Sequence, residues 1–359
     1  MKKVLSFFCI LFFLAALFLE LNTKSVQEIV NDNYATEIGL IKSYGRNNEV
    51  SVLSESMGQY MEYLLFMKDD RAFYEQTELL RDYFLAKQND SLFIKWQVED
   101  NTSTNASVDD LRIIHSLKKA GRIFQRAEYS ALAGELEKSL LAHQLKDGVL
   151  TDFYDWKTKQ KSPLIHLSYI DMDVLENTIG IDKTAYQEML ERSGLEKSPF
   201  FQEVWNIEKK KYEQANKQEV DIIDQLLIAI QYVKGLGKTP DTFDKWLKNK
   251  WQIQGELFGR YVKTGHTPSV PYESSAVYAL AVQYFLLTGQ DKFADELNKK
   301  LLKQPPFMVQ NSLSSIHFFD FMLAHITAEQ YEQERQKNKN SNKIIFVQCI
   351  PTKGVRREF

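Results

Sequence analysis

Residues 53–67 read LSESMGQYMEYLLFM, and this stretch sets a pattern that much of the chain repeats. Tyr60, Tyr63, Leu64 and Met67 recur at the spacing i, i+3, i+4, i+7, which predicts a helix with one buried stripe. Four later segments show helical spacing too, with the stripes Phe73, Thr77, Leu80 and Phe84; Leu132, Leu136 and Leu140; Ile222, Leu226, Ile230 and Val233; and Val277, Leu280, Ala281 and Tyr284. The sequence therefore predicts an all-α body.

Short breaks separate the predicted helices, at residues 146–148, 194, 235–237, 288–289 and 304–306. Because connections this short make neighbouring helices antiparallel, we expect stacked helical hairpins in one domain. Residues 92–98 and 257–262 have an extended pattern instead. We expect them to form β-ribbons or long loops at one end of the array, where binding groups tend to collect.

The composition of the 359 residues excludes several classes of protein. An apolar content of 44% and a charged content of 26% allow a large core, and the 15 glycines and 8 prolines are few for an all-β chain. Two cysteines, Cys9 and Cys349, cannot make a disulfide framework or a four-cysteine zinc site. A net charge of −3 gives no electrostatic reason to expect nucleic acid as the partner.

The N-terminus has the order of an export signal. Lys2 and Lys3 precede an apolar run at residues 4–21, which polar residues 22–25 close. Residues 1–25 are therefore predicted to be a signal peptide or an uncleaved membrane anchor, since such a run can just cross a hydrocarbon core about 30 Å thick. The positive-inside rule then places the rest of the chain, an expected domain at 26–330 and a loosely held basic tail at 331–359, outside the cytoplasmic membrane.

Several catalytic motifs are missing from the sequence. The six histidines have no H-E-x-x-H spacing, and the chain has no G-x-S-x-G and no phosphate-binding G-x-x-x-x-G-K. Asp171 and Asp173 form a D-x-D without a third ligand, which favours solvated or capping carboxylates over a metal site. We therefore expect no metal and no cofactor.

Carboxylates set among aromatic residues are what remains, since Phe, Trp and Tyr make up 13% of the chain. This composition suits sugar binding, because a pyranose stacks its C–H faces on aromatic rings and its hydroxyls bond carboxylates. It also suits a large helical core, and the aromatic count alone does not separate the two interpretations.

Two predicted helix starts carry acids. Ser54 is expected to cap the first, which puts Glu55 in its first turn and Gly58 where another chain or a ligand could approach closely. Ser107 is expected to cap the second, followed by Asp109 and Asp110. The plainer alternative is that these acids only interact with the helix dipoles.

The segment at residues 54–60, SESMGQY, resembles the S-E-G-x-G-Y-type segment of glycoside hydrolase family 8. The segment ASVDDLRI at 106–113 resembles the A-T-D-A-D-x-x-I signature of that family, and segments at 167–169, 220–226 and 272–278 follow in the family's order. The similarity is greatest to divergent, membrane-anchored members associated with exopolysaccharide synthesis in Gram-positive bacteria. It implies an (α/α)6 barrel that hydrolyses β-1,4-linked glycans with inversion of configuration.

The resemblance assigns the general acid to Glu55, whose pKa would have to be raised by burial beside an aromatic wall such as Tyr60 or Trp96. Asp110 matches the acid that holds the sugar at the cleavage site. Val108 replaces the signature's first Asp, and Asp109 stands where a small residue is usual. Neighbours on a helix point about 100° apart, so the question of which acid, Asp109 or Asp110, faces the sugar stays open.

The general base is assigned by order along the chain. Asp224 is the first choice, although the arginine and proline of the family's usual segment are absent around it. Asp221, on roughly the same helix face, and Glu273 are the alternatives. Tyr60, Trp96, Tyr169, Tyr272 and Glu273 are expected to contact the substrate, together with Asp109 and Asp110.

We therefore expect an extracytoplasmic, monomeric, inverting glycoside hydrolase that cleaves a secreted β-linked exopolysaccharide. The alternative is a catalytically silent helical barrel that binds nascent exopolysaccharide and assists its export. A lyase or epimerase on the same ring of helices has little support, because the histidines are scattered along the sequence.

Overall fold

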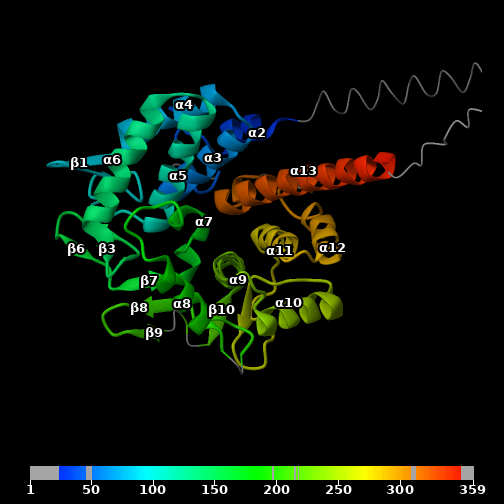
Figure 1. Ribbon diagram of the computed structural model, residues 1–359. Helices are drawn as coiled ribbons and strands as arrows, with labels where there is room; N and C mark the ends of the chain where they lie inside the picture. Colours follow the sequence, from blue (N-terminus) through cyan, green and yellow to red (C-terminus); the bar gives the residue numbers. More distant parts are fainter. Residues whose placement is uncertain are drawn as a thin grey trace, which may run out of the picture.

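The described part of the chain forms twelve α-helices in two concentric layers around one axis, as the computed structural model shows (Figure 1). The structure describes residues 24–45, 51–195, 198–213, 216, 218–308 and 313–348, with the side chains of the last helix described to residue 337. The inner helices are α3 (Ser54–Phe66), α5 (Ser107–Ile123), α7 (Met172–Leu175), α9 (Ile222–Leu236), α11 (Ser275–Leu287) and α13 (Phe318–Gln348). The outer helices are α2 (Val26–Asn33), α4 (Asp70–Leu79), α6 (Ala127–Gln144), α8 (Lys183–Ser193), α10 (Asp241–Gln254) and α12 (Asp291–Leu301).

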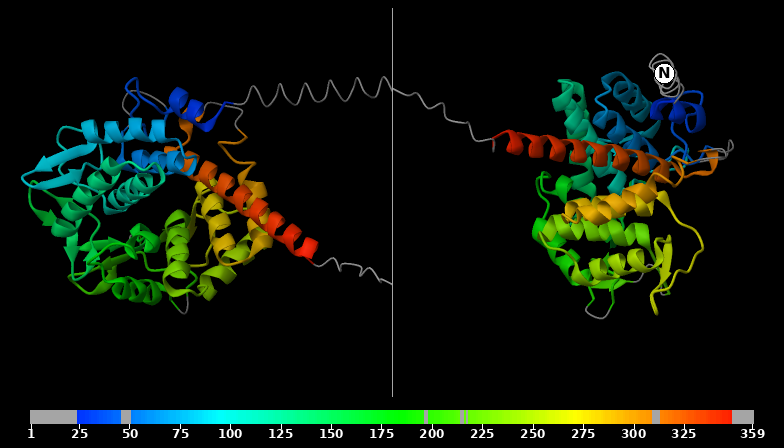
Figure 2. Two further views of the ribbon diagram at one scale, coloured as in Figure 1. Left: turned by 45° about the horizontal axis from the view of Figure 1, so that its top comes forward. Right: turned by 90° about the vertical axis from the view of Figure 1, so that its right-hand side faces the viewer.

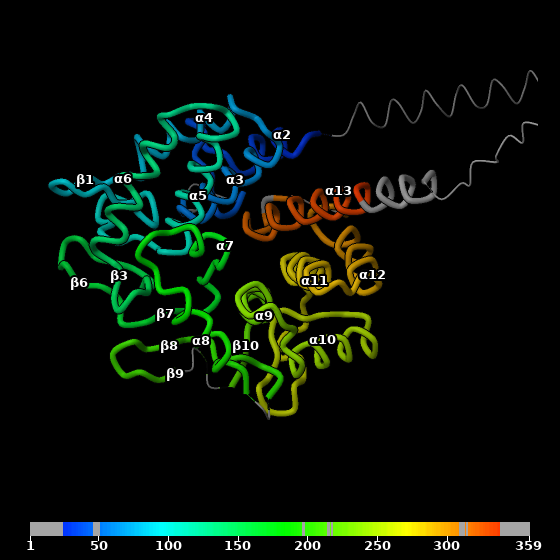
Figure 3. Tube along the Cα trace, in the orientation of Figure 1, coloured from blue at the N-terminus to red at the C-terminus, as the bar shows by residue number. Residues whose placement is uncertain are grey.

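The inner layer is a closed ring. Each inner helix contacts the next in chain order, and α13 returns to contact α3, which closes the circle (Figures 1 and 2). Outer helices join consecutive members of the ring, so the fold is an (α/α)6 barrel, as the family resemblance predicted. Short helical turns extend it at η1 (Leu80–Phe84), η2 (Leu167–Tyr169) and η3 (Leu313–Ser315). The tube in Figure 3 traces the same path from α2 to α13.

The predicted stripes make the core. Tyr63, Leu64, Phe73 and Leu226 are among the fully or nearly fully buried side chains, although Met67, the last member of its stripe, is exposed. Helix α11 is apolar on every side, because it packs against α9, α12 and α13 at once. Burial of these faces is the main source of stability, since short isolated helices are marginal in water.

Short β-ribbons project from the helical layers. The pairs are β1 (Leu85–Gln88) with β2 (Ser91–Ile94), β3 (Leu145–Lys146) with β4 (Val149–Leu150), β5 (Tyr154–Asp155) with β6 (Gln160–Lys161), and β10 (Glu219–Asp221) with β11 (Arg260–Val262). A three-stranded sheet has the order β7 (Leu164–His166), β8 (Val204–Asn206), β9 (Lys211–Glu213). Both predicted extended stretches include a strand. The others were not predicted, because two or three residues are too few to show a period-2 pattern.

The helix starts differ from prediction by one residue. Leu53 and Ala106 occupy the N-cap positions, and Ser54 and Ser107 are the first helical residues, with no capping bond from either side chain. The Ser54 hydroxyl lies instead 2.8 Å from Asp109 Oδ2, so it joins α3 to α5 rather than capping its own helix.

Gly58 gives this pair of helices its close contact. A Cβ atom at Gly58 would lie 3.1 Å from Cδ of Arg112 and 3.2 Å from Cγ1 of Ile113. The neighbour that approaches the glycine is therefore α5 itself, and the glycine serves helix packing rather than ligand binding.

The C-terminal region is helical where a loose tail was expected. Helix α13 continues to Gln348, beyond the expected boundary at 330. Tyr331 donates a hydrogen bond of 2.6 Å to Asp295 of α12, and Arg335 forms ion pairs with Asp291 and Asp295. Polar composition misled the prediction here, because a helix packed on one neighbour can be polar over the rest of its surface.

The predicted signal or anchor lies almost wholly outside the described residues, which begin at Lys24. Within the described part of the chain, no helix has both the length and the hydropathy of a membrane span. Helix α2 starts at the end of the barrel where the turn between α3 and α4 lies. Gln27, in the first turn of α2, donates a hydrogen bond of 2.8 Å to Asp69 in that turn. It ends near the start of α13, where Tyr34 bonds the carbonyl of Ile316.

Candidate active site

The N-terminal ends of α3, α5, α9 and α13 lie at one end of the barrel, and each of these four helices brings an acid there in its first turn. These acids are Glu55 on α3, Asp109 on α5, Asp224 on α9 and Asp320 on α13. Sequence reasoning did not single out Asp320, which accepts a 2.6 Å hydrogen bond from Ser274 beside α11. The positive ends of the helix dipoles make this end of the barrel favourable for negative charge.

Glu55 is half-buried, and no described residue donates a hydrogen bond to its carboxyl group. Burial raises its pKa to about 7, with further contributions from the charges of Asp109 and Asp320, whereas Arg112 opposes the rise. A carboxyl group with this pKa keeps its proton in about half of the molecules at pH 7 and can donate it.

Asp109 and Asp110 take different directions, as their position on a helix requires. Asp109 adjoins Glu55 and forms an ion pair of 3.0 Å with Arg112. Asp110 accepts a 2.6 Å hydrogen bond from Asn105, and burial raises its pKa well above the usual value. Asn105 also bonds Gln144, so Asp110 belongs to a buried polar network. The acid beside Glu55 is therefore Asp109, and the structure does not support Asp110 as the residue that holds the sugar.

Arg112 lies under the acids of α3 and α5. Besides Asp109 it contacts Glu62, with 3.4 Å between Nε and Oε2. Its guanidinium compensates the charge of Asp109, which is buried next to Glu55. Sequence reasoning did not select Arg112, because Asp109 and Arg112 have the spacing of an ordinary exposed ion pair on a helix.

Asp224 and Asp221 also separate in the structure. Asp221 caps α9 by accepting the N–H of Ile223 and lies 3.5 Å from Nε of Arg260. Asp224 lies three residues further along α9, and burial raises its pKa. The charge of Asp221 raises this pKa further, whereas Ser168, His166 and Arg260 lower it. Asp221 has a structural task, and Asp224 is the better candidate for a base.

Tyr169 lies between the two groups of acids. Its pKa is raised to about 12, first by burial and then by the charges of Asp152, Asp109, Asp224 and Glu55. Tyr169 therefore lies near acids of both the α3–α5 side and the α9 side of the ring.

A histidine and an aspartate that sequence reasoning did not select join this site. Nδ1 of His166 lies 2.7 Å from Asp152 Oδ2, and the His166 ring lies 5.2 Å from the ring of Tyr169. Fourteen residues separate the pair in the chain, and no catalytic motif has that spacing. The short strand β7 brings them together, and a strand of three residues leaves almost no trace in a sequence.

The predicted aromatic contacts divide into exposed and buried residues. Trp96 is 39% exposed, and its carbonyl accepts the N–H of Ser54, next to Glu55. Tyr272 is 53% exposed and lies over Gly259, where a Cβ would come within 2.9 Å of the ring. Tyr60, only 3% exposed, packs against Tyr63 and Phe318, so the prediction that it contacts substrate is wrong.

Glu273 does not join the acids around Glu55. Its carboxylate accepts hydrogen bonds from Tyr278 and Gln304 and forms an ion pair of 2.9 Å with Lys300. These three partners fix it beside α11 and α12, and the geometry does not support it as a base or as a sugar contact.

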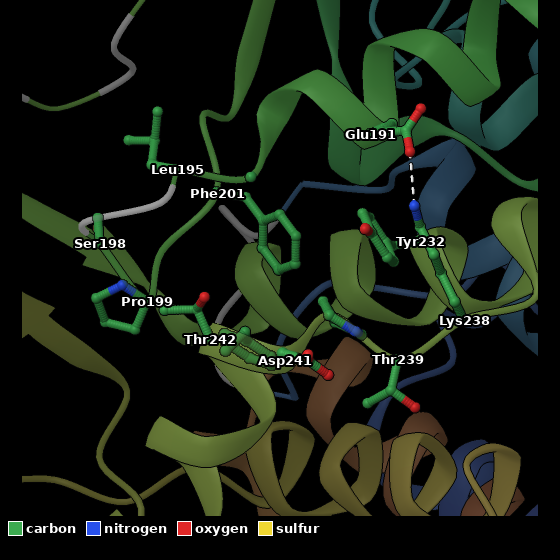
Figure 4. A pocket seen from close by; sticks show the side chains of 13 residues that line it. Glu191, Leu195, Ser198, Pro199, Phe201, Tyr232, Lys238, Thr239, Asp241 and Thr242 are labelled. Atoms are coloured by element: carbon green, nitrogen blue, oxygen red, sulfur yellow. Dashed lines mark hydrogen bonds and ion pairs between the residues drawn. The ribbon is translucent and has the colours of Figure 1, made fainter.

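Two cavities lie away from this site. The first, of about 330 Å³, is lined in part by Phe201, Tyr232 and Thr242, with the ion pair of Glu191 and Lys238 at its edge (Figure 4). The second, of about 410 Å³, lies against Trp205 and Tyr212. No predicted site residue lines either cavity.

The described residues hold no cluster of three or more His, Cys, Asp or Glu that could bind a metal ion. Asp171 caps α7, and Asp173 forms an ion pair of 2.6 Å with Lys234, so the D-x-D has the capping role that was expected.

The ring of helices and the acids at one end define a class of protein, that of the (α/α)6 barrels with the fold of family 8 glycoside hydrolases. Endoglucanase Cel10 from Klebsiella pneumoniae, described as a family 8 glycosyl hydrolase, has the same fold, with a TM-score of 0.61 over 84% of this chain and 97% of its own at 15% identity. An alpha-amylase from Clostridium perfringens superposes with a TM-score of 0.72 over 84% and 96%, at 22% identity. No family model matches the sequence.

Two proteins are similar in sequence as well. PssZ from Listeria monocytogenes is 34% identical, with a TM-score of 0.78 over 85% of this chain and 94% of its own. A Bacillus subtilis (strain 168) protein named "Putative lipoprotein YdaJ" is 33% identical over 309 residues, which are 83% of this chain and 82% of the relative. The chain belongs to one family with YdaJ and PssZ, a branch with the family 8 fold.

Proposed function

We propose that the protein is an inverting glycoside hydrolase with Glu55 as general acid and Asp224 as general base. The observation that carries the proposal is the state of Glu55, whose half-buried carboxyl group has a pKa of about 7 and no hydrogen-bond donor among the described residues. A structural acid at a helix start would instead be ionised and hydrogen-bonded to backbone N–H groups.

The order of the ring supports the assignment of the base. Helices α3 and α9 are three places apart in a ring of six, so Glu55 and Asp224 lie on opposite sides of the barrel axis. Inversion needs this opposition, because the acid and the water must reach the anomeric carbon from opposite faces of the sugar.

In the reaction, Glu55 gives its proton to the glycosidic oxygen as the bond from that oxygen to the anomeric carbon breaks. Asp224 takes one proton from a water molecule, whose oxygen bonds the anomeric carbon from the other side. The products are a new reducing end with inverted configuration and a free hydroxyl on the leaving sugar. The two carboxyl groups have then exchanged protonation states, and solvent restores them.

The substrate we propose is a secreted β-linked polysaccharide. Trp96 on the α3 side and Tyr272 on the α9 side offer exposed rings for stacking, with Tyr169 between the acids. Solved proteins of this fold include enzymes described as endo-β-1,4-glucanase, xylanase and alpha-amylase, so the linkage rests on the motif resemblance rather than on the fold.

We propose in addition that the domain is tethered at the outer side of the cytoplasmic membrane. The relative YdaJ is named as a lipoprotein, and the apolar run at residues 4–21 is the predicted anchor. Since α2 starts near Asp69, at the end of the barrel opposite the acids, a tether before α2 would direct the site away from the lipid.

A binding protein without activity is the second candidate. The observation in its favour is the sequence around Asp224, which has neither the arginine nor the proline of the family's usual base segment. Such a protein would bind glycan through Trp96 and Tyr272 and release no fragments.

Incubation of the full chain with the purified polysaccharide of its own producer, followed by measurement of new reducing ends, decides between the two. We expect release by the unaltered protein and a rate at least about 10³-fold lower for Glu55→Gln. Glu75→Gln, on the surface of α4, is the control and should keep the full rate. Binding without release by the unaltered protein would favour the silent binder, and equal release by Glu55→Gln would remove Glu55 as the acid.

A further inference from the structure

Asp152 holds both the main chain and the side chain of His166. One oxygen of its carboxylate accepts the backbone N–H of His166 at 2.8 Å, and the other lies 2.7 Å from Nδ1. The Asp152 side chain is only 8% exposed, and its backbone carbonyl accepts the N–H of Ser107 at 2.8 Å. The pair is thus fixed to the start of α5, the helix that carries Asp109.

This hold orients the imidazole. With Nδ1–H donating to Asp152, Nε2 is left without a hydrogen-bond partner among the described residues, and the side chain is 35% exposed. Burial lowers the pKa of His166, but the hydrogen bond and charge of Asp152, with the charges of Asp224 and Glu203, outweigh it and raise the pKa above its usual value. The positive form of the imidazole therefore persists to higher pH than in an ordinary histidine.

The groups around Asp224 show why a cation there matters. Burial and Asp221 act against ionisation of Asp224, whereas Ser168, His166 and Arg260 act for it. Arg260 lies 3.5 Å from Asp221, so part of its charge is already compensated. Glu203, 6% exposed, bonds Gln225 and lies 4.0 Å from Lys263. His166 immediately precedes η2, and η2 packs against α9, the helix that carries Asp224, so the imidazole held by Asp152 lies on the α9 side of the ring.

We propose that His166, oriented by Asp152, is a positioning residue of the active site that keeps the Asp224 carboxylate charged and ready to accept a proton. The inference rests on the proposed function in so far as Asp224 is the base. It adds His166 and Asp152 to the proposed site. It also explains the acidic limit of activity, because hydrolysis needs Asp224 without its proton and Glu55 with its proton.

NMR titration tests the coupling without any need for turnover. The full chain in detergent micelles, labelled with ¹³C at Asp carboxyl carbons and ¹⁵N in His rings, gives both pKa values, with signals assigned through Asp224→Asn and His166→Gln. We expect His166→Gln to raise the pKa of Asp224 by about one unit and Asp152→Asn to lower that of His166 by about one unit. His143→Gln, in which the replaced ring bonds Ser91 away from the site, should change neither.

An unchanged pKa of Asp224 in His166→Gln, in a variant whose spectrum is otherwise native, would overturn the proposal. In the hydrolysis assay, the acidic limb of the pH–rate profile should move up by the same amount as the pKa, about one unit, while the rate above that limb changes little. A uniform fall in rate at every pH would likewise contradict the proposal. Failure of the unaltered protein to hydrolyse glycan would reject the proposed function alone, since the titration reads the coupling separately.

Discussion

Glu55 on α3 and Asp224 on α9 lie in the first turn of an inner helix, at the same end of the barrel and on opposite sides of its axis. Their surroundings differ. On the α3 side Arg112 is paired with Asp109, and the charges of Asp109 and Asp320 oppose the ionisation of Glu55. On the α9 side Ser168, His166 and Arg260 support the charge of Asp224. Position in a helix thus leaves the role of a carboxyl group open, and the proposed roles of Glu55 and Asp224 rest on the charged groups near each of them.

After Glu55→Gln, the base side gives the largest expected effect. Asp224→Asn should lower the rate of reducing-end release by at least about 100-fold, because the variant lacks the proposed general base. Asp221→Asn should lower it by less than about tenfold, since this residue caps α9 and contributes about 1 kcal/mol to folding. Both variants are measured with the same substrate. A larger loss of rate in Asp221→Asn than in Asp224→Asn would make Asp221 the general base instead.

The acid side depends on Arg112 for stability. Arg112→Met leaves Asp109 buried without its cation, and we expect the free energy of unfolding to fall by about 3 kcal/mol. Urea titration followed by circular dichroism measures the loss. Adding Asp109→Asn to Arg112→Met should recover part of it, whereas equal losses in the single and double variants would show that Arg112 acts through packing alone.

The pH profile sharpens the comparison between the two sides. Hydrolysis needs Glu55 with its proton, so the rate should fall about tenfold per pH unit above a limit near the pKa of about 7. The sign follows from the raised pKa, because the protonated form persists to higher pH than in an ordinary glutamate. Initial rates between pH 4 and about 9 measure both limbs, and a basic limit near pH 5 would contradict the burial of Glu55.

The smallest effect concerns the two exposed rings. Trp96→Ala and Tyr272→Ala should each weaken substrate binding by about 1 kcal/mol, seen as a roughly fivefold rise in KM with little change in kcat. Tyr60→Phe, which alters a buried ring, should leave KM unchanged. A larger effect from Tyr60→Phe than from Trp96→Ala would reverse the distinction drawn from their exposure.

The helices could be read from the sequence, because burial of one face imposes a spacing that the chain displays locally. The stripes of α3, α4, α6, α9 and α11 and the short breaks between them predicted helical hairpins, and the motif around Glu55 predicted the closed barrel by resemblance. The prediction of a loose tail beyond residue 330 was wrong, since polar composition does not separate a helix packed on one neighbour from a loose segment.

The sequence by itself also determined which acids begin the inner helices, Glu55, Asp109, Asp110 and Asp224 among them. Only the tertiary structure decided that Asp109 rather than Asp110 adjoins Glu55, that Tyr60 belongs to the core, and that His166 is held by Asp152. The physical reason is that helix spacing is a short-range property, whereas burial and charge depend on distances between residues that only the closing of the ring brings together.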